Sequence, residues 1–183
     1  MKKTFAKIYF KLNRWKYNEF PDIKKAVVLM APHTSFWDFV LGKLYFNLYN
    51  YKPQILIKKE AFWGPLGYFL KKWGGIPVDR GKRNGIADML TKRIKEAKDR
   101  FYLVITPEGT RKKTKNWKKG FIKIAKEADV PVIVGFIDKK TKTLGVIGLL
   151  DMQGTDMEIM ERLKKHYVGI TGLRKNKFET GYE

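Results

Sequence analysis

Short apolar runs alternate with amphipathic segments along almost the whole chain, and this alternation restricts the possible folds more than any other feature. The apolar runs predict buried strands, and segments with apolar residues three or four positions apart predict helices. We expect strands at residues 26–30, 55–57, 76–78, 101–105, 130–136 and 144–149, and helices at residues 1–20, 35–50, 64–73, 84–99, 117–128 and 157–167. This order indicates an α/β fold with a largely parallel central sheet flanked by helices.

The length of the chain indicates one domain. Its 183 residues, 44% of them apolar, are enough to bury a substantial core. No internal repeat, linker or low-complexity block divides the sequence. We therefore expect a single domain over residues 1–183.

The first 20 residues predict a basic amphipathic helix. Its apolar residues fall at helical spacing among many lysines and are Phe5, Ile8, Tyr9, Leu12 and Trp15. Two interpretations remain open at this stage. The helix packs this stripe on the rest of the domain, or it lies in the headgroup region of a membrane.

The charge of the chain predicts an anionic partner. There are 39 lysines and arginines against 18 acidic residues, a formal net charge of +21, and 14% of the residues are aromatic. Basic and aromatic residues together suit an anionic membrane surface, where aromatic rings settle at the interface. They also suit single-stranded nucleic acid, where aromatic rings stack on bases.

The sequence also predicts the cellular location of the protein. No stretch reaches the roughly 20 apolar residues of a membrane-spanning helix, and the N-terminus lacks the apolar region of a signal peptide. No cysteine is present, and the two histidines lie far apart, so we expect no metal site. These features favour a peripheral protein on the cytoplasmic face of a membrane.

His33 and Asp38 are the first candidate catalytic residues. They follow the apolar run 26–30, with Ser35 between them as the expected N-cap of the next helix. An imidazole held by a carboxylate is a general base that can activate a hydroxyl group. The alternative is that Asp38 only completes a capping box with Ser35 and that His33 is an ordinary loop residue.

Two further motifs follow predicted strands. The run 74–80 has the sequence Gly-Gly-Ile-Pro-Val-Asp-Arg and ends at Arg80, and the run 107–111 has the sequence Pro-Glu-Gly-Thr-Arg. A guanidinium can bind a phosphate through two hydrogen bonds, and Glu108 would then hold the loop or a substrate hydroxyl. His33, Arg80 and Glu108 all follow strands, so we expect them to converge on one edge of the sheet.

The order of these motifs resembles that of the glycerophospholipid acyltransferase family and its lysophosphatidic acid acyltransferases. The resemblance covers residues 27–136 and rests on the His-x-x-x-x-Asp, Gly-Gly-Ile-Pro-Val-Asp-Arg and Pro-Glu-Gly-Thr-Arg motifs. Pro77, Thr106, Lys112 and Val134 depart from residues often found in that family, although the catalytic and charged residues remain.

The resemblance implies transfer of a fatty acyl group from a thioester, either acyl-CoA or acyl carrier protein, to the hydroxyl of a lysophospholipid such as 1-acyl-glycerol-3-phosphate. It implies that His33 is the general base and that Asp38 orients it. It places the acceptor phosphate at five residues, namely Arg80, Glu108, Gly109, Thr110 and Arg111. No cofactor is implied beyond the co-substrate, and no nucleic acid is expected as a partner.

The remaining expectations concern the oxyanion, two lysines and an aromatic segment. The tetrahedral oxyanion needs hydrogen-bond donors, and backbone N–H groups near Ser35 are candidates. Lys58 and Lys59 are candidate headgroup contacts, and the aromatic residues of 62–73 either enclose an acyl chain, enter the interface or form a core helix. The alternative to an enzyme is a basic lipid- or nucleic-acid-binding protein without catalytic activity.

Overall fold

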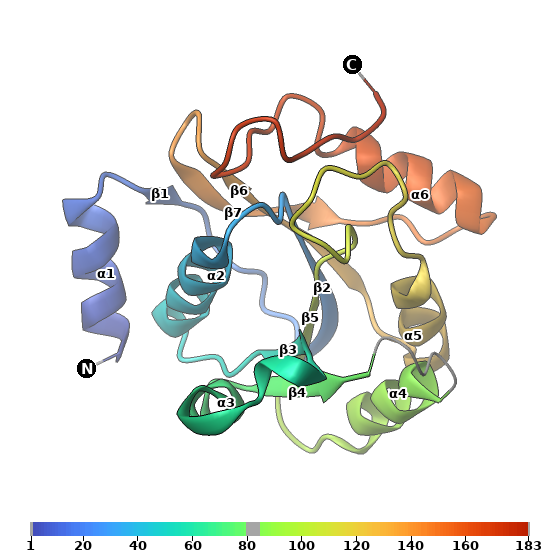
Figure 1. Ribbon diagram of the computed structural model, residues 1–183. Helices are drawn as coiled ribbons and strands as arrows, with labels where there is room; N and C mark the ends of the chain where they lie inside the picture. Colours follow the sequence, from blue (N-terminus) through green and yellow to red (C-terminus); the bar gives the residue numbers. More distant parts are fainter. Residues whose placement is uncertain (1, 80–84, 183) are drawn as a thin grey trace.

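The computed structural model describes residues 2–79 and 85–182, and in these residues the chain forms a seven-stranded sheet (Figure 1). The strand order is β1-β7-β6-β2-β5-β3-β4. The strands are β1 Lys16–Tyr17, β2 Lys25–Ala31, β3 Gln54–Lys58, β4 Gly75–Val78, β5 Phe101–Ile105, β6 Val132–Asp138 and β7 Thr143–Leu149. The helices are α1 Lys2–Leu12, α2 Phe36–Leu48, the 3-10 turn η1 Lys59–Ala61, α3 Gly64–Lys72, α4 Ile86–Glu96, α5 Gly120–Ala128 and α6 Asp156–Lys165.

Strand β2 lies inside the sheet and is buried on both faces. Its side chains alternate, so that Val27 and Leu29 join a core with α4, α5 and α6, whereas Ala26 and Val28 join a core with α1 and α2. Figure 1 shows these two groups of helices on opposite faces of the sheet. A strand that is covered on both faces is expected to be apolar throughout, and the run 26–30 is.

The predicted α/β fold with a largely parallel sheet is confirmed. Every strand pair is parallel except β6 with β7, which is antiparallel. The short turn Lys139–Lys142 between these two strands leaves no room for a crossover helix, which explains the change of direction.

The predicted helix at residues 1–20 is wrong beyond Leu12. Arg14 has a φ of 56°, in the left-handed region, and this ends the helical path. The chain then pairs Lys16 and Tyr17 with β7 as an edge strand that the sequence pattern did not predict. Trp15 therefore lies outside the helix.

The apolar residues of α1 are divided between two faces. Ala6 and Phe10 are fully buried in the core beside α2, whereas Phe5, Ile8 and Leu12 are exposed, and Tyr9 is partly buried. The interpretation that the stripe packs on the domain is therefore wrong for Phe5, Ile8 and Leu12, whereas contact of these residues with a membrane stays a prediction. Phe10, which is off that stripe, attaches the helix to the domain, and three stripe residues face outward.

Adjacent parallel strands bring the sequence motifs together. Strand β2 ends at Ala31 and strand β5 ends at Ile105, and the two pair in parallel with Leu29 opposite Ile105. Because their carboxyl ends lie at the same sheet edge, the loops that carry His33 and Glu108 meet there.

Candidate active site

The turn from β2 into α2 is organised by a capping box. Ser35 is the N-cap of α2, and its Oγ accepts a hydrogen bond from the N–H of Trp37 at 3.3 Å. The Oδ2 atom of Asp38 accepts the backbone N–H groups of Thr34 and Ser35, each at 2.6 Å. These contacts hold the loop rigidly against the first turn of the helix.

His33 and Asp38 also form an ion pair. Nδ1 of His33 lies 3.5 Å from Oδ2 of Asp38, and the side chains are 23% and 6% exposed, respectively. This distance is longer than that of a normal hydrogen bond. The capping interpretation of Asp38 is confirmed, and it is compatible with the catalytic one, because the same carboxylate faces the imidazole.

The backbone N–H groups at this turn already have acceptors. Those of Thr34 and Ser35 donate to Asp38, and that of His33 donates to Glu108. They are therefore not available to an oxyanion, and the expectation that donors near Ser35 serve that purpose is not supported for these groups.

Glu108 supports the loop that carries His33. It is buried, and its Oε1 accepts the backbone N–H of His33 at 2.7 Å. It does not lie in the wall of the cavity described below. Its observed contact joins the loop after β5 to the loop after β2, and the phosphate contact that the resemblance implies for Glu108 stays a prediction.

Burial raises the pKa of Glu108 to about 8, and the nearby charge of Asp38 acts in the same direction, against the lowering effect of the His33 N–H bond. A carboxyl group without water around it favours its neutral form. Glu108 therefore carries a proton over much of the range below neutrality.

Two substitutions separate the contact of Glu108 from its charge. Glu108→Gln keeps a side-chain oxygen for the N–H of His33, whereas Glu108→Ala leaves that donor unpaired. We expect the turnover number to fall by about 10- to 100-fold in E108A and by less than about threefold in E108Q. Equal losses in the two variants would contradict the positioning role.

The variant E108Q also tests the raised pKa of Glu108. The pKa of Glu108 is about 8 in the folded protein against an ordinary value of 4.5, so between these values the folded protein keeps a proton that the unfolded chain has released. This contribution to stability is complete below pH 4.5 and is lost as the pH rises through 8. Urea unfolding at several pH values should show a weaker loss with rising pH in E108Q.

The loop 107–111 is a tight turn, and part of it lines a cavity. The N–H of Gly109 donates to the carbonyl oxygen of Thr106 at 3.0 Å, and Gly109 has a φ of 64°, which glycine adopts without strain. Thr106, Gly109, Thr110 and Arg111 all line the cavity. Arg80, the remaining predicted phosphate ligand, lies outside the described residues.

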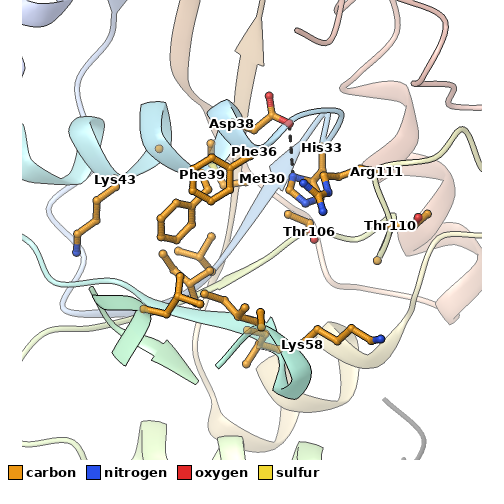
Figure 2. A pocket seen from close by; sticks show the side chains of 18 of the residues that line it. Met30, His33, Phe36, Asp38, Phe39, Lys43, Lys58, Thr106, Thr110 and Arg111 are labelled. Atoms are coloured by element: carbon orange, nitrogen blue, oxygen red, sulfur yellow. Dashed lines mark ion pairs between the residues drawn. The ribbon is translucent and has the colours of Figure 1, made fainter. Parts of the chain in front are cut away.

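The cavity has a volume of about 490 Å³, within the usual range for small-molecule sites. His33, Asp38, Thr110 and Arg111 form its polar end (Figure 2). The rest is lined mainly by apolar side chains of α2, β3 and α3, which include Phe36, Phe39, Ile55, Ile57, Leu66 and Leu70. The arrangement places a potential base and cation beside an apolar chamber.

Lysines lie at other points of the cavity wall. Lys58 lines it, 3.6 Å from Glu60, whereas Lys59 does not line it. Lys43, which the sequence analysis missed, also lines it, and burial is the main cause that lowers its pKa. Lys43 lies at helical spacing from Phe36 and Phe39, and this spacing could have shown that all three line the same side of the cavity.

Comparisons with known proteins agree with this geometry. The family model described as Acyltransferase matches residues 11–136. A 1-acyl-sn-glycerol-3-phosphate acyltransferase of Saccharomyces cerevisiae (strain ATCC 204508 / S288c) is 32% identical over 131 residues, covering 66% of this chain and 41% of the yeast protein. The chain therefore spans less than half the length of that relative.

A solved structure shares the fold. The crystal structure of the 1-acyl-sn-glycerophosphate acyltransferase PlsC from Thermotoga maritima superimposes with a TM-score of 0.60 and 18% sequence identity. The match covers 90% of this chain and 76% of that chain.

Proposed function

This chain belongs to the acyltransferase family, and from that membership we propose that it transfers a fatty acyl group from a thioester donor to the hydroxyl of a lysophospholipid. The preferred acceptor is 1-acylglycerol 3-phosphate, the substrate class that the names of the yeast and Thermotoga relatives specify. One observation carries the proposal: the His33–Asp38 pair lies at the polar end of a largely apolar cavity.

The proposed chemistry begins at the imidazole. Because Nδ1 of His33 faces Asp38, Nε2 is left for the acceptor. Nε2 takes the proton of the hydroxyl group as its oxygen attacks the thioester carbonyl carbon. The carbon–sulfur bond then breaks, and the departing thiolate receives the proton from the imidazolium, so that ester and thiol are the products.

Asp38 supports the charge that His33 gains in this step. Its carboxylate fixes the ring orientation and stabilises the imidazolium through their ion pair. The two backbone N–H groups bound to Oδ2 hold the carboxylate itself in place. The pair therefore needs little rearrangement before proton transfer.

The acceptor phosphate is proposed to bind at the polar end of the cavity. Thr110 and Arg111 line the cavity, and Figure 2 shows Arg111 at the same end as His33. A guanidinium binds a phosphate through paired, charge-assisted hydrogen bonds. Lys58 adds a further cation on the same cavity wall.

The apolar part of the cavity is proposed to hold an acyl chain. A larger side chain at Gly42 would shorten this part of the cavity. Gly42 lines the cavity from α2, and a Cβ built there meets no atom within 4 Å. Gly42→Phe should therefore add bulk on the cavity side of α2, and replacing a glycine inside a helix should not weaken that helix.

We expect kcat/KM for a palmitoyl donor to fall by about tenfold or more relative to an octanoyl donor in G42F, since each buried methylene contributes about 0.8 kcal/mol. The matched control is Gly120→Phe at the start of α5, where a Cβ also meets nothing. An unchanged chain-length preference in G42F would mean that the chain binds elsewhere.

Attachment to an anionic membrane surface is proposed as the setting of the reaction. Trp63 is 85% exposed, and Leu66, Tyr68 and Phe69 of α3 are also exposed, beside the cavity that Leu66 lines. Exposed aromatic residues beside Lys71 and Lys72 suit the lipid interface. Among the described residues, no helix combines the length and apolarity required to span a bilayer.

The proposal is tested by thiol release from acyl-CoA and acyl carrier protein donors, with 1-acylglycerol 3-phosphate in anionic vesicles as acceptor. Release of thiol with matching formation of a diacyl lipid is the expected result. Binding to vesicles without thiol release across a panel of donors and lysolipids would favour a lipid-binding protein instead.

A further inference from the structure

A second cavity lies next to the catalytic segment, on the side of α1. It has a volume of about 370 Å³ and is lined by residues of α1, the start of α2, the β6–β7 turn and the C-terminal segment. Three cationic side chains line it, namely Lys139, Lys142 and Arg174. No carboxylate appears in the described part of its wall.

The cations of this cavity are not neutralised within the described parts of the chain. Lys139 and Arg174 take part in none of the ion pairs found there, and the Nζ of Lys142 donates to the carbonyl oxygen of Asn13 at 3.4 Å. Three cations that converge without acidic partners repel one another and attract a multiply charged anion.

An aromatic ring accompanies these cations. Trp37 lines the cavity and is 57% exposed, so its indole face is open to a ligand. Planar bases stack on such rings, whatever their identity. A ligand that carries both a base and several phosphates therefore matches the wall.

The cavity is joined to the catalytic pair through one short segment. Ser35 and Trp37 line this cavity, whereas His33, Phe36 and Asp38 line the cavity that holds the proposed acyl chain. The N–H of Arg174 donates to Oγ1 of Thr34 at 3.1 Å, next to His33. The cationic cavity is thus fixed close to the reacting atoms.

We infer that this cavity binds the nucleotide end of a coenzyme A thioester. The inference rests on the proposed acyl transfer, which needs an anionic donor as well as an anionic acceptor. The phosphates would contact Lys139, Lys142 and Arg174, with the adenine on Trp37. The flexible arm would then pass over residues 33–36 and deliver its thioester to His33. A recessed wall with an aromatic ring suits a nucleotide better than the convex surface of an acyl carrier protein.

The test uses the double charge reversal Lys139→Glu with Arg174→Glu. The control is Lys98→Glu with Lys126→Glu, two exposed lysines that line neither cavity and change the net charge equally. The donors are acyl-CoA and the same acyl group on N-acetylcysteamine, which has the thioester but no phosphate. Binding of adenosine 3′,5′-bisphosphate alone is measured by calorimetry.

We expect the KM for acyl-CoA to rise by about tenfold or more in the cavity variant only. The KM for the truncated donor and for the lysophospholipid should not change, and binding of the bisphosphate should weaken by a similar factor. Equal values in the cavity and control variants would overturn the inference. So would use of carrier-protein donors alone, or a raised KM for the lysophospholipid.

The two proposals can fail separately. If no donor supports transfer, the proposed function fails, and bisphosphate binding that the cavity variant loses would still establish the nucleotide site. If acyl-CoA is used well and the bisphosphate does not bind, the nucleotide site fails while the acyltransferase remains.

Discussion

Replacing His33 by alanine is expected to lower the turnover number by about 10²- to 10⁴-fold, the usual contribution of a positioned general base. The variant removes the only imidazole in the described cavity wall, so the acceptor hydroxyl has no group there to take its proton. His33 contacts Asp38 at 3.5 Å and is partly exposed, so its loss should change the free energy of unfolding little. Thiol release and thermal unfolding, measured on one preparation, check both statements.

His166→Ala is the matched control for this prediction. The chain has two histidines, and His166 is the C-cap of α6, away from the wall of the cavity. It should keep the wild-type rate. Vesicle binding should be the same in both variants. If H33A retained more than about a tenth of the wild-type turnover, the general-base role would be wrong.

Replacing Asp38 by alanine is expected to lower both activity and stability. The Oδ2 atom accepts two backbone N–H groups at 2.6 Å and faces His33. Asp38→Ala leaves these buried donors unpaired, which should lower the free energy of unfolding by about 2–4 kcal/mol. Turnover should also fall by at least about 10²-fold, because nothing then orients the imidazole.

Asp38→Asn separates the two effects. Its amide oxygen can still accept the N–H groups of Thr34 and Ser35, so most of the stability should return. Its neutral side chain does not stabilise an imidazolium, so activity should stay low. Urea unfolding beside a kcat measurement distinguishes the cases. Activity close to wild type in D38N would show that Asp38 only caps the helix.

Much of the fold could be predicted from short-range patterns. The run 26–30 is apolar without alternation, as a strand with both faces covered should be, and it forms β2. Ser35 was expected to begin a helix and is the N-cap of α2. The convergence of His33 and Glu108 followed from placing both after parallel strands, and their hydrogen bond shows that they meet.

Other features depend on contacts that no local pattern records. The end of α1 and the edge pairing of β1 depend on β7, which lies more than a hundred residues later. The resemblance implied a phosphate contact for Glu108, but the burial of this side chain depends on how two loops pack, which no motif records. The cationic cavity collects residues from four separate segments, so no single motif could reveal it.

The inner position of β2 also determines how late during unfolding the loop that carries His33 loses its structure. Strand β2 is hydrogen-bonded to β5 on one side and to β6 on the other, and His33 follows its carboxyl end. Amides in such a strand exchange with solvent only through the largest openings of a protein, whereas edges and peripheral helices open locally. We therefore expect fraying of β1 or α1 to leave the His33–Asp38 geometry intact, and we expect these two residues to belong to the last part of the protein that unfolds.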